Sequence, residues 1–169
     1  MLRREPSKGN LRWLWLSLAI IIADQSTKHA MLAAFRPGDE LPLTPFASLV
    51  LAFNRGAAFS FLAGEDGWQR WLFAAIAVAA CVAMAWLLRR GGSGLFCAGL
   101  ALIIGGALGN LFDRLTLGHV VDFLLVHYDG WYFPAFNVAD SAITIGAAAL
   151  IVDSFRERPS AGRSTTKDR

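Results

Sequence analysis

Two aspartates are the residues of this sequence best suited to chemistry. Asp122 lies in a short apolar stretch rich in β-branched residues, and Asp140 lies near the start of the last long apolar run. When two carboxyl groups lie within a few ångströms in a poorly hydrated site, the pKa of one rises and the pair holds a single proton near neutral pH. The ionised carboxylate can take a proton from water while the protonated one hydrogen-bonds a scissile carbonyl. The pair therefore predicts peptide hydrolysis by an aspartic mechanism, if both side chains face one groove.

Further polar residues accompany the two aspartates. Asn110 and Arg114 are four residues apart at the end of an apolar run, so they share one helix face. Asn137 precedes Asp140 by three residues, and Ser141 and Thr144 extend the same polar face of an otherwise apolar helix. Such a face must look inward in a membrane protein. We therefore expect Asn110, Arg114 and Asn137 to surround Asp122 and Asp140.

Other hydrolytic motifs are missing from the sequence. There is no His-Glu-x-x-His, and His29, His119 and His127 do not have metal-ligand spacing on one helix. Neither a Gly-x-Ser-x-Gly elbow nor a Gly-x-x-x-x-Gly-Lys phosphate loop occurs. We therefore expect no metal and no cofactor, and we interpret His119 and His127 as polar-side residues of a strand.

The composition indicates that the bilayer is the solvent. Hydrophobic residues make up 55% of the 169 residues and charged residues 17%, with a mean hydropathy of +0.45, which is too apolar for a soluble domain of this size. A helix needs roughly 20 residues to cross a hydrocarbon core of about 30 Å. The sequence therefore predicts an all-α membrane protein of four transmembrane helices with a small extracytoplasmic β-sheet. The expected helices cover residues 13–35, 68–88, 95–112 and 136–155.

The basic residues indicate the topology. Eleven of the sixteen Lys and Arg residues lie in the N-terminal tail, at Arg89 and Arg90, or in the C-terminal tail. The positive-inside rule then places both termini in the cytoplasm, which four spans satisfy. We expect one membrane-embedded domain over residues 1–155 and a disordered cytoplasmic tail over 156–169. The net charge of +3 does not predict nucleic-acid binding, because the basic residues flank apolar segments.

A cleaved signal peptide is the alternative for the first apolar stretch. A basic start precedes the apolar run 14–23, as in secretory signals. Ile21 stands two residues before Ala23, where the A-x-A cleavage pattern needs a small residue. We therefore favour a retained helix.

Two of the predicted helices carry residues with a structural role. Asp24 and Lys28 are four residues apart, so an ion pair between them would reduce the cost of burying either charge. The alternative is a pair at the membrane interface that merely ends the helix. Gly105 and Gly109 have the small-xxx-small spacing that lets helix backbones approach closely. Both cysteines lie in predicted spans, and we interpret them as structural free thiols.

The two connections on the outer side contain β-rich runs. Residues 48–53 follow Pro37, Pro42 and Pro45, which exclude a helix, and read as a strand. Residues 119–128 read as a second strand, with Asp122 on one face. We expect the two strands to pair in a small sheet on the bilayer.

The sequence resembles the bacterial lipoprotein signal peptidases, also called signal peptidase II. Five segments carry the resemblance, in order along the chain. They are Asp-Gln-Ser-Thr-Lys at 24–28, Asn-Arg-Gly-Ala-Ala-Phe at 54–59, Gly-Gly-Ala-Leu-Gly-Asn-Leu-Phe-Asp-Arg at 105–114, Val-Val-Asp-Phe at 120–123 and Phe-Asn-Val-Ala-Asp-Ser at 136–141.

The resemblance implies an inner-membrane endopeptidase that removes the signal peptide of a prolipoprotein. The cysteine after the cleavage site of that substrate carries a diacylglyceryl group. The implied fold is four helices with a small extracytoplasmic sheet, and the implied site lies near the periplasmic face. We expect this prolipoprotein and membrane lipid as partners, no nucleic acid, and a monomeric enzyme.

The resemblance also implies roles for individual residues. Asp122 and Asp140 match the catalytic pair, and Asp24 and Lys28 match a polar pair that supports it. The positions that line the site or hold substrate match Asn54, Gly56, Asn110, Arg114 and Asn137. We further hypothesise that the loop near Phe59 covers the site.

Two other classes of protein remain open at this point. A small transporter or proton-conducting protein would also carry ionisable residues within its spans. The echo between Ala-Phe-Asn at 52–54 and at 135–137 is too short to count as an internal repeat of the kind transporters show. A purely structural protein would need neither aspartate for activity.

Overall fold

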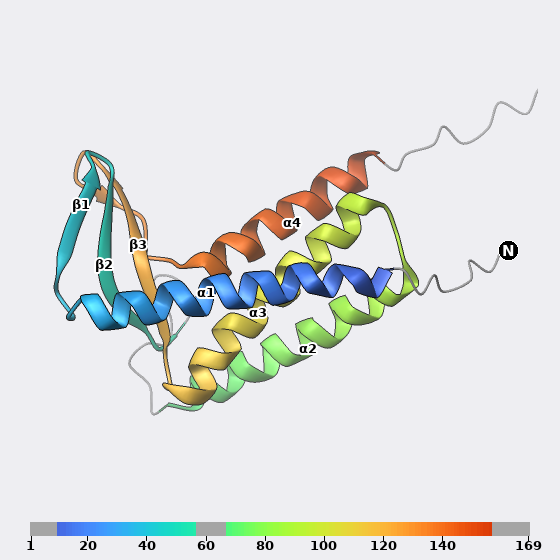
Figure 1. Ribbon diagram of the computed structural model, residues 1–169, viewed down its shortest axis with the longest axis horizontal. Helices are drawn as coiled ribbons and strands as arrows, with labels where there is room; N and C mark the ends of the chain where they lie inside the picture. Colours follow the sequence, from blue (N-terminus) through green and yellow to red (C-terminus); the bar gives the residue numbers. More distant parts are fainter. Residues whose placement is uncertain (1–9, 57–66, 157–169) are drawn as a thin grey trace, which may run out of the picture.

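The computed structural model describes residues 10–56 and 67–156, which form a helix bundle with a small β-sheet at one end (Figure 1). The expected disordered tail and the hypothesised loop near Phe59 lie outside the described residues. A 3-10 turn at Asn10–Trp13 precedes the first helix. The α-helices are α1 (Leu14–Ala34), α2 (Trp68–Arg90), α3 (Gly94–Thr116) and α4 (Val138–Arg156). The strands are β1 (Glu40–Thr44), β2 (Ala47–Asn54), β3 (Val120–Tyr128) and β4 (Trp131–Tyr132).

Helix α3 is the central element of the bundle and packs against α1, α2 and α4. Small residues allow this close packing. A Cβ atom added at Gly105 would lie 2.8 Å from the Ser17 carbonyl oxygen of α1, and one at Gly99 would lie 2.9 Å from the Gly146 carbonyl oxygen of α4. Real Cβ atoms essentially never come so close. The predicted use of the glycines, close approach of helix backbones, is confirmed.

Three of the described helices are long and apolar enough to cross a membrane. These are α2, α3 and α4. Helix α1 has 21 residues and is apolar up to Ala23, but the polar run from Asp24 to His29 lowers its hydropathy. The expectation of four membrane-crossing helices is thus met for three. In α1 the two charges of that run, Asp24 and Lys28, are buried inside the protein.

The sheet is antiparallel with the order β1-β2-β3-β4. The predicted pairing of the two strands is confirmed, with Ala52 opposite Asp122 and Asn54 opposite Val120. A register shift between Leu49 and Ala52 marks a β-bulge in β2. Strand β1 was not among the predicted strands, and Pro42 lies in it. Proline is tolerated there because β1 is an edge strand and need not donate on its free side.

The helix ends differ from the expected ranges where they meet the sheet. Helix α3 continues through Thr116, so Arg114 lies in its last turn instead of beyond it. Helix α4 begins at Val138 and not at Phe136. The reason is that Phe136 forms a β-bridge with Leu124 and is therefore extended. The two corrections place the polar residues of α3 and α4 at the end of the bundle that carries the sheet (Figure 1).

The glycine contacts give a first prediction. Gly105→Val should lower the thermal unfolding midpoint of the detergent-solubilised protein by several degrees, because the added methyl groups collide with the α1 backbone at Ser17. Overpacking of this kind costs about 1–3 kcal/mol. Ala148→Val enlarges an exposed side chain of α4 and is the matched control. A Gly105→Val protein as stable as this control would contradict the described packing of α1 on α3.

Candidate active site

The start of α4 is fixed by a reciprocal pair of hydrogen bonds. The backbone N–H of Asp140 donates to Asn137 Oδ1 at 2.9 Å, and the backbone N–H of Asn137 donates to Asp140 Oδ2 at 3.3 Å. This is a capping-box arrangement, with Asn137 as the N-cap and Asp140 three residues later. Asp140 is thereby held at the first turn of a helix, where the helix dipole favours a negative charge.

The same segment is tied to the strand that carries Asp122. The Phe136 carbonyl accepts hydrogen bonds from the backbone N–H groups of Phe123 and Leu124, at 3.1 and 2.9 Å. The Phe136 N–H donates in return to the Leu124 carbonyl at 3.0 Å. Because Phe136 is two residues from the start of α4, these bonds bring Asp122 and Asp140 to one place.

Two asparagine amides connect the two carboxyl groups. Asn137 Nδ2 donates to Asp122 Oδ1 at 2.7 Å, and Asn110 Nδ2 donates to Asp140 Oδ1 at 2.8 Å. The amides are themselves joined, since Asn137 Nδ2 lies 3.2 Å from Asn110 Oδ1. Each carboxyl group therefore has an amide that orients it. Residues from α3, β3 and α4 meet in this one network, as the sequence predicted for their positions.

A buried cluster of charges lies beneath this network. Lys28 Nζ forms ion pairs with Asp24 and Asp113, at 2.8 Å each, and donates to Asn110 Oδ1 at 2.9 Å. The exposed fractions are 0% for Asp24, 1% for Lys28 and 2% for Asp113. The predicted ion pair of Asp24 and Lys28 is confirmed. The alternative of an interfacial pair that ends the helix is wrong, because α1 continues to Ala34 and both charges are buried.

The two carboxylates of the cluster hold the backbone beside each candidate catalytic residue. Asp24 Oδ1 accepts from the N–H of Ala139 at 2.9 Å, next to Asp140. Asp113 Oδ2 accepts from the N–H of Val121 at 3.2 Å, next to Asp122. The charged cluster therefore fixes α4 on one side and β3 on the other. Lys28 and its two partners act on the candidate site through these backbone contacts.

Asp113 and Gln25 were not among the residues expected at the site. Gln25 Nε2 donates to Asp113 Oδ1 at 2.8 Å and lies 3.3 Å from the Gly109 carbonyl, so it links α1 to α3. Both residues lie within segments that carry the family resemblance. Spacing supplied a signal for Asp113, because it follows Asn110 by three residues and is thus on a neighbouring helix face. For Gln25 the sequence offered no signal beyond its place beside Asp24.

The site opens into a groove of about 1010 Å³. Six of the expected residues line it, and the other three, Asn137, Asp24 and Lys28, are buried below. Its polar lining consists mainly of Asn54, Gly56, Asn110, Arg114, Asp122 and Asp140. The lining also includes apolar side chains, among them Phe133, Phe136, Ile143 and Ile145. A groove lined by both polar and apolar groups suits a substrate that has both characters.

Arg114 lies at the edge of the groove with hydrogen-bond donors to spare. Its Nη1 lies 3.3 Å from the Asn110 carbonyl, and its Nη2 lies 3.4 Å from the Gly56 carbonyl. Its guanidinium also lies over the Phe73 ring, 5.3 Å from the centroid, and within residues 10–56 and 67–156 its Nε has no hydrogen-bond partner. Asn54 accepts from the N–H of Gly56 at 3.0 Å, which shapes the turn that presents the Gly56 carbonyl. These groups can meet peptide carbonyls and amides of a bound chain.

Burial changes the protonation of Asp122. The side chain is 3% exposed, and its burial raises the pKa to about 7, with the nearby charge of Asp140 adding to the rise. Hydrogen bonds from Asn54 and Asn137 act in the opposite direction and lower the pKa. Near neutral pH this carboxyl group therefore still carries a proton in a substantial fraction of molecules.

Comparison with known proteins now decides the family. A family model described as signal peptidase (SPase) II matches residues 16–156. The chain belongs to the signal peptidase II family. It is therefore a peptidase of lipoprotein processing and a bacterial membrane protein.

Proteins that are similar in sequence or in structure agree with this family membership. Lipoprotein signal peptidase of Ralstonia nicotianae is 57% identical over 145 residues, which cover 85% of this chain and 84% of the relative. The lipoprotein signal peptidase of Paraburkholderia phymatum is 53% identical over 154 residues, covering 90% and 93%. A solved bacterial membrane enzyme, determined by the in meso method at 2.3 Å resolution, superposes with a TM-score of 0.81 at 26% identity, covering 99% of this chain and 100% of that one. The transporter and scaffold alternatives gain no support from these relatives.

The charged cluster of this signal peptidase gives a second prediction. Lys28→Met should destabilise the protein by about 3–5 kcal/mol, because it leaves two buried carboxylates without a compensating cation. Asp113→Asn should cost less, since Lys28 keeps Asp24 as a partner. Thermal unfolding in detergent measures both.

Asp129→Asn is the matched control for the charge change. Asp129 is exposed and has φ of 47°, a conformation that asparagine tolerates well. If Lys28→Met is no less stable than Asp129→Asn, the cluster does not hold the bundle as described.

Proposed function

We propose that this peptidase cuts the signal peptide from diacylglyceryl-modified prolipoproteins, with Asp122 and Asp140 activating water. One observation carries the proposal: two carboxyl groups, each oriented by an asparagine amide, line a groove whose lining also includes apolar side chains. A lipid-modified peptide is confined to the bilayer. Its enzyme needs polar groups at the scissile bond and an apolar flank beside them, which this groove supplies.

The surroundings of the two carboxyl groups favour a different role for each. Asp140 accepts hydrogen bonds from the Asn137 N–H and from Asn110, and it lies in the first turn of α4. These contacts stabilise its ionised form. Asp122 is the more buried of the two, and its pKa is about 7. In the resting pair, Asp140 is therefore the ionised base and Asp122 the protonated acid.

The chemical step follows from this assignment. Asp140 takes a proton from water as the water oxygen bonds to the scissile carbonyl carbon, and Asp122 donates its proton to the carbonyl oxygen. The tetrahedral intermediate then collapses. The carbon–nitrogen bond breaks, the proton held by Asp140 passes to the leaving nitrogen, and the hydroxyl proton of the intermediate returns to Asp122. The pair ends with one proton, as it began.

The remaining expected residues bind and position the substrate in this proposal. Arg114 and Asn54 face the groove with polar groups that bind backbone carbonyls and amides of the peptide. The Gly56 carbonyl accepts a hydrogen bond from Arg114 and so orients its guanidinium, and Asn110 and Asn137 hold the two carboxyl groups in place. Asp24 and Lys28 support the site from below.

We infer that all four helices cross the bacterial inner membrane, with both termini cytoplasmic. Helix α1 turns its two charges into the protein, which removes the obstacle to its crossing. Arg12, Arg89, Arg90 and Arg156 lie at helix ends opposite the sheet (Figure 1), as the positive-inside rule requires of a cytoplasmic end. The groove, at the sheet end, then lies near the periplasmic face. One chain supplies every residue of the dyad and its support, which favours a monomer.

The dyad gives a third prediction. Asp122→Asn and Asp140→Asn should each lower the rate of cleavage of a diacylglyceryl-modified prolipoprotein by at least about 10²–10⁴-fold, the usual contribution of positioned acid–base groups. Both proteins should unfold near the wild-type temperature, and Asp129→Asn should cleave at the wild-type rate. Wild-type rates in both dyad variants would rule out the aspartic mechanism. If the wild type cleaves only substrate without the lipid group, the proposed substrate class is wrong.

The pKa of Asp122 gives a fourth prediction, on pH. Since the acid must carry a proton in the free enzyme, kcat/KM should fall as pH rises through about 7. The apparent pKa of this fall is a property of Asp122 and Asp140 together, because the two groups share one proton. Initial rates of cleavage between pH 5 and pH 9, in buffers of constant ionic strength, measure it. A kcat/KM that stays constant or rises up to pH 9 would contradict the assignment of Asp122 as the acid.

A further inference from the structure

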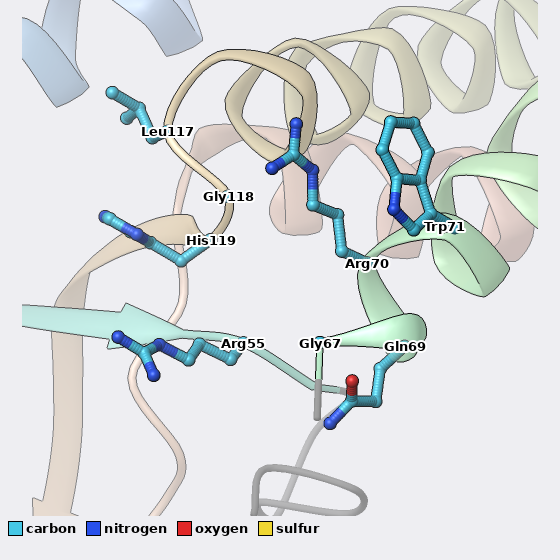
Figure 2. Close-up of a pocket in the computed structure, with 8 residues that line it drawn as sticks. All are labelled: Arg55, Gly67, Gln69, Arg70, Trp71, Leu117, Gly118 and His119. Atoms are coloured by element: carbon cyan, nitrogen blue, oxygen red, sulfur yellow. The ribbon is translucent and has the colours of Figure 1, made fainter. Parts of the chain in front are cut away.

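A second cavity of about 410 Å³ lies between the start of α2 and the turn that joins α3 to β3. We refer to it as the α2–α3 cavity. Figure 2 shows Arg55 and His119 on one side of it and Arg70 and Gly67 on the other. No acidic residue is among the described residues that line it. The described part of its lining thus holds two arginines and a histidine and no carboxylate.

The two arginines have unused capacity for an anion. Both ion pairs within the described ranges involve Lys28, so neither Arg55 nor Arg70 is neutralised by a described carboxylate. Arg70 Nη2 donates to the Leu115 carbonyl at 3.0 Å, but its Nε is buried and has no hydrogen-bond partner among the described residues. Burial and the charge of Arg55 lower the pKa of His119, so the imidazole is neutral at pH 7. The two guanidinium groups therefore supply the positive charge of the cavity.

The start of α2 adds to the positive electrostatic character of the cavity. Gly67 is its N-cap and offers no side chain to cap the helix, and the first turn contains no acidic residue. The unpaired N–H groups of such a terminus favour an anion. Together with the arginines, which bind phosphate oxygens in a fork geometry, they describe a site for a phosphate group.

The position of the cavity indicates which phosphate it meets. Trp68 and Trp71 at the start of α2 are 49% and 62% exposed, and Arg70 lies over the Trp71 ring, 4.8 Å from its centroid. Exposed tryptophans at the end of a membrane-crossing helix mark the headgroup level. Further along α2, Ile76 and Val82 are exposed on an apolar surface that suits acyl chains.

We propose that the α2–α3 cavity binds the phosphate of an anionic phospholipid headgroup. Arg55 also lines the groove of the candidate active site, and it stands between Asn54 and Gly56. A lipid phosphate on Arg55 therefore braces the turn whose Gly56 carbonyl contacts Arg114. The binding itself does not depend on the proposed catalytic mechanism, and a binding measurement tests it separately.

The test compares two lipids on three proteins. Phosphatidylglycerol and phosphatidylcholine with identical acyl chains are added to delipidated protein in detergent, and native mass spectrometry gives the affinity for each. The wild type should prefer phosphatidylglycerol. Arg55→Gln should weaken phosphatidylglycerol binding about fivefold, since a basic residue near a lipid surface contributes about 1 kcal/mol. Arg55 is exposed and forms no hydrogen bond within the described chain, so its replacement leaves the fold intact.

Arg90→Gln is the matched control. Arg90 also lies over a tryptophan ring, at 3.6 Å from the centroid of Trp86, but at the other end of α2 and away from the cavity. The Arg90→Gln protein should bind phosphatidylglycerol as the wild type does. Equal affinity of the wild type for both lipids, or equal loss in Arg55→Gln and Arg90→Gln, would overturn the proposal.

Inorganic phosphate distinguishes a lipid site from a site for free phosphate. Titrated calorimetrically into the delipidated protein, it should bind far more weakly than phosphatidylglycerol, because it lacks the apolar contacts along α2. Inorganic phosphate that binds as tightly as the lipid would overturn the lipid proposal and identify a free-phosphate site.

Discussion

The neutralisation of Lys28 inside the bundle is the constraint on which the rest of the site depends. A buried ammonium group is tolerated only when charged partners and hydrogen bonds surround it. Here Asp24, Asp113 and Asn110 occupy its three donors. Each partner has a second contact, to Ala139, to Val121 or to Asp140. The geometry that satisfies one buried charge therefore fixes the backbone beside both candidate catalytic aspartates.

The two carboxyl groups come from elements of different stiffness, and the fold compensates for this. Asp140 belongs to the first turn of a helix that packs closely on α3, whereas Asp122 lies on a strand of a small sheet. The bridge between Phe136 and Leu124 joins strand to helix, so that the distance between the groups does not depend on the outer edge of the sheet. Rigid placement of this kind is what general acid–base chemistry requires. The strands beyond β3 remain free to form the wall of the groove.

Features that follow from residue spacing and residue type were predictable from the sequence. Features that depend on which distant segments meet in the folded chain were not. Spacing and residue type predicted three features: the close packing of helices at the glycines of α3, the pairing of β2 with β3, and the ion pair of Asp24 with Lys28. Asp113 was missed because its role depends on which residue of β3 lies beside it. Strand β1 was not predicted, because its prolines were used only to exclude a helix, and a strand with Pro42 is tolerated at a sheet edge. The capping box of Asn137 and Asp140 was hidden by Phe136, whose apolar side chain placed the expected start of α4 too early.

The proposed aspartic mechanism is tested most directly by observing the proton that Asp122 and Asp140 are proposed to share. Infrared difference spectroscopy of the unliganded protein, titrated from pH 5 to pH 9, detects protonated carboxyl groups. A proton shared by the pair predicts one carboxyl signal that disappears as the pH rises through about 7 and that is absent from Asp122→Asn. A wild-type protein with no carboxyl group that titrates in this range, or the same signal undiminished in Asp122→Asn, would contradict it.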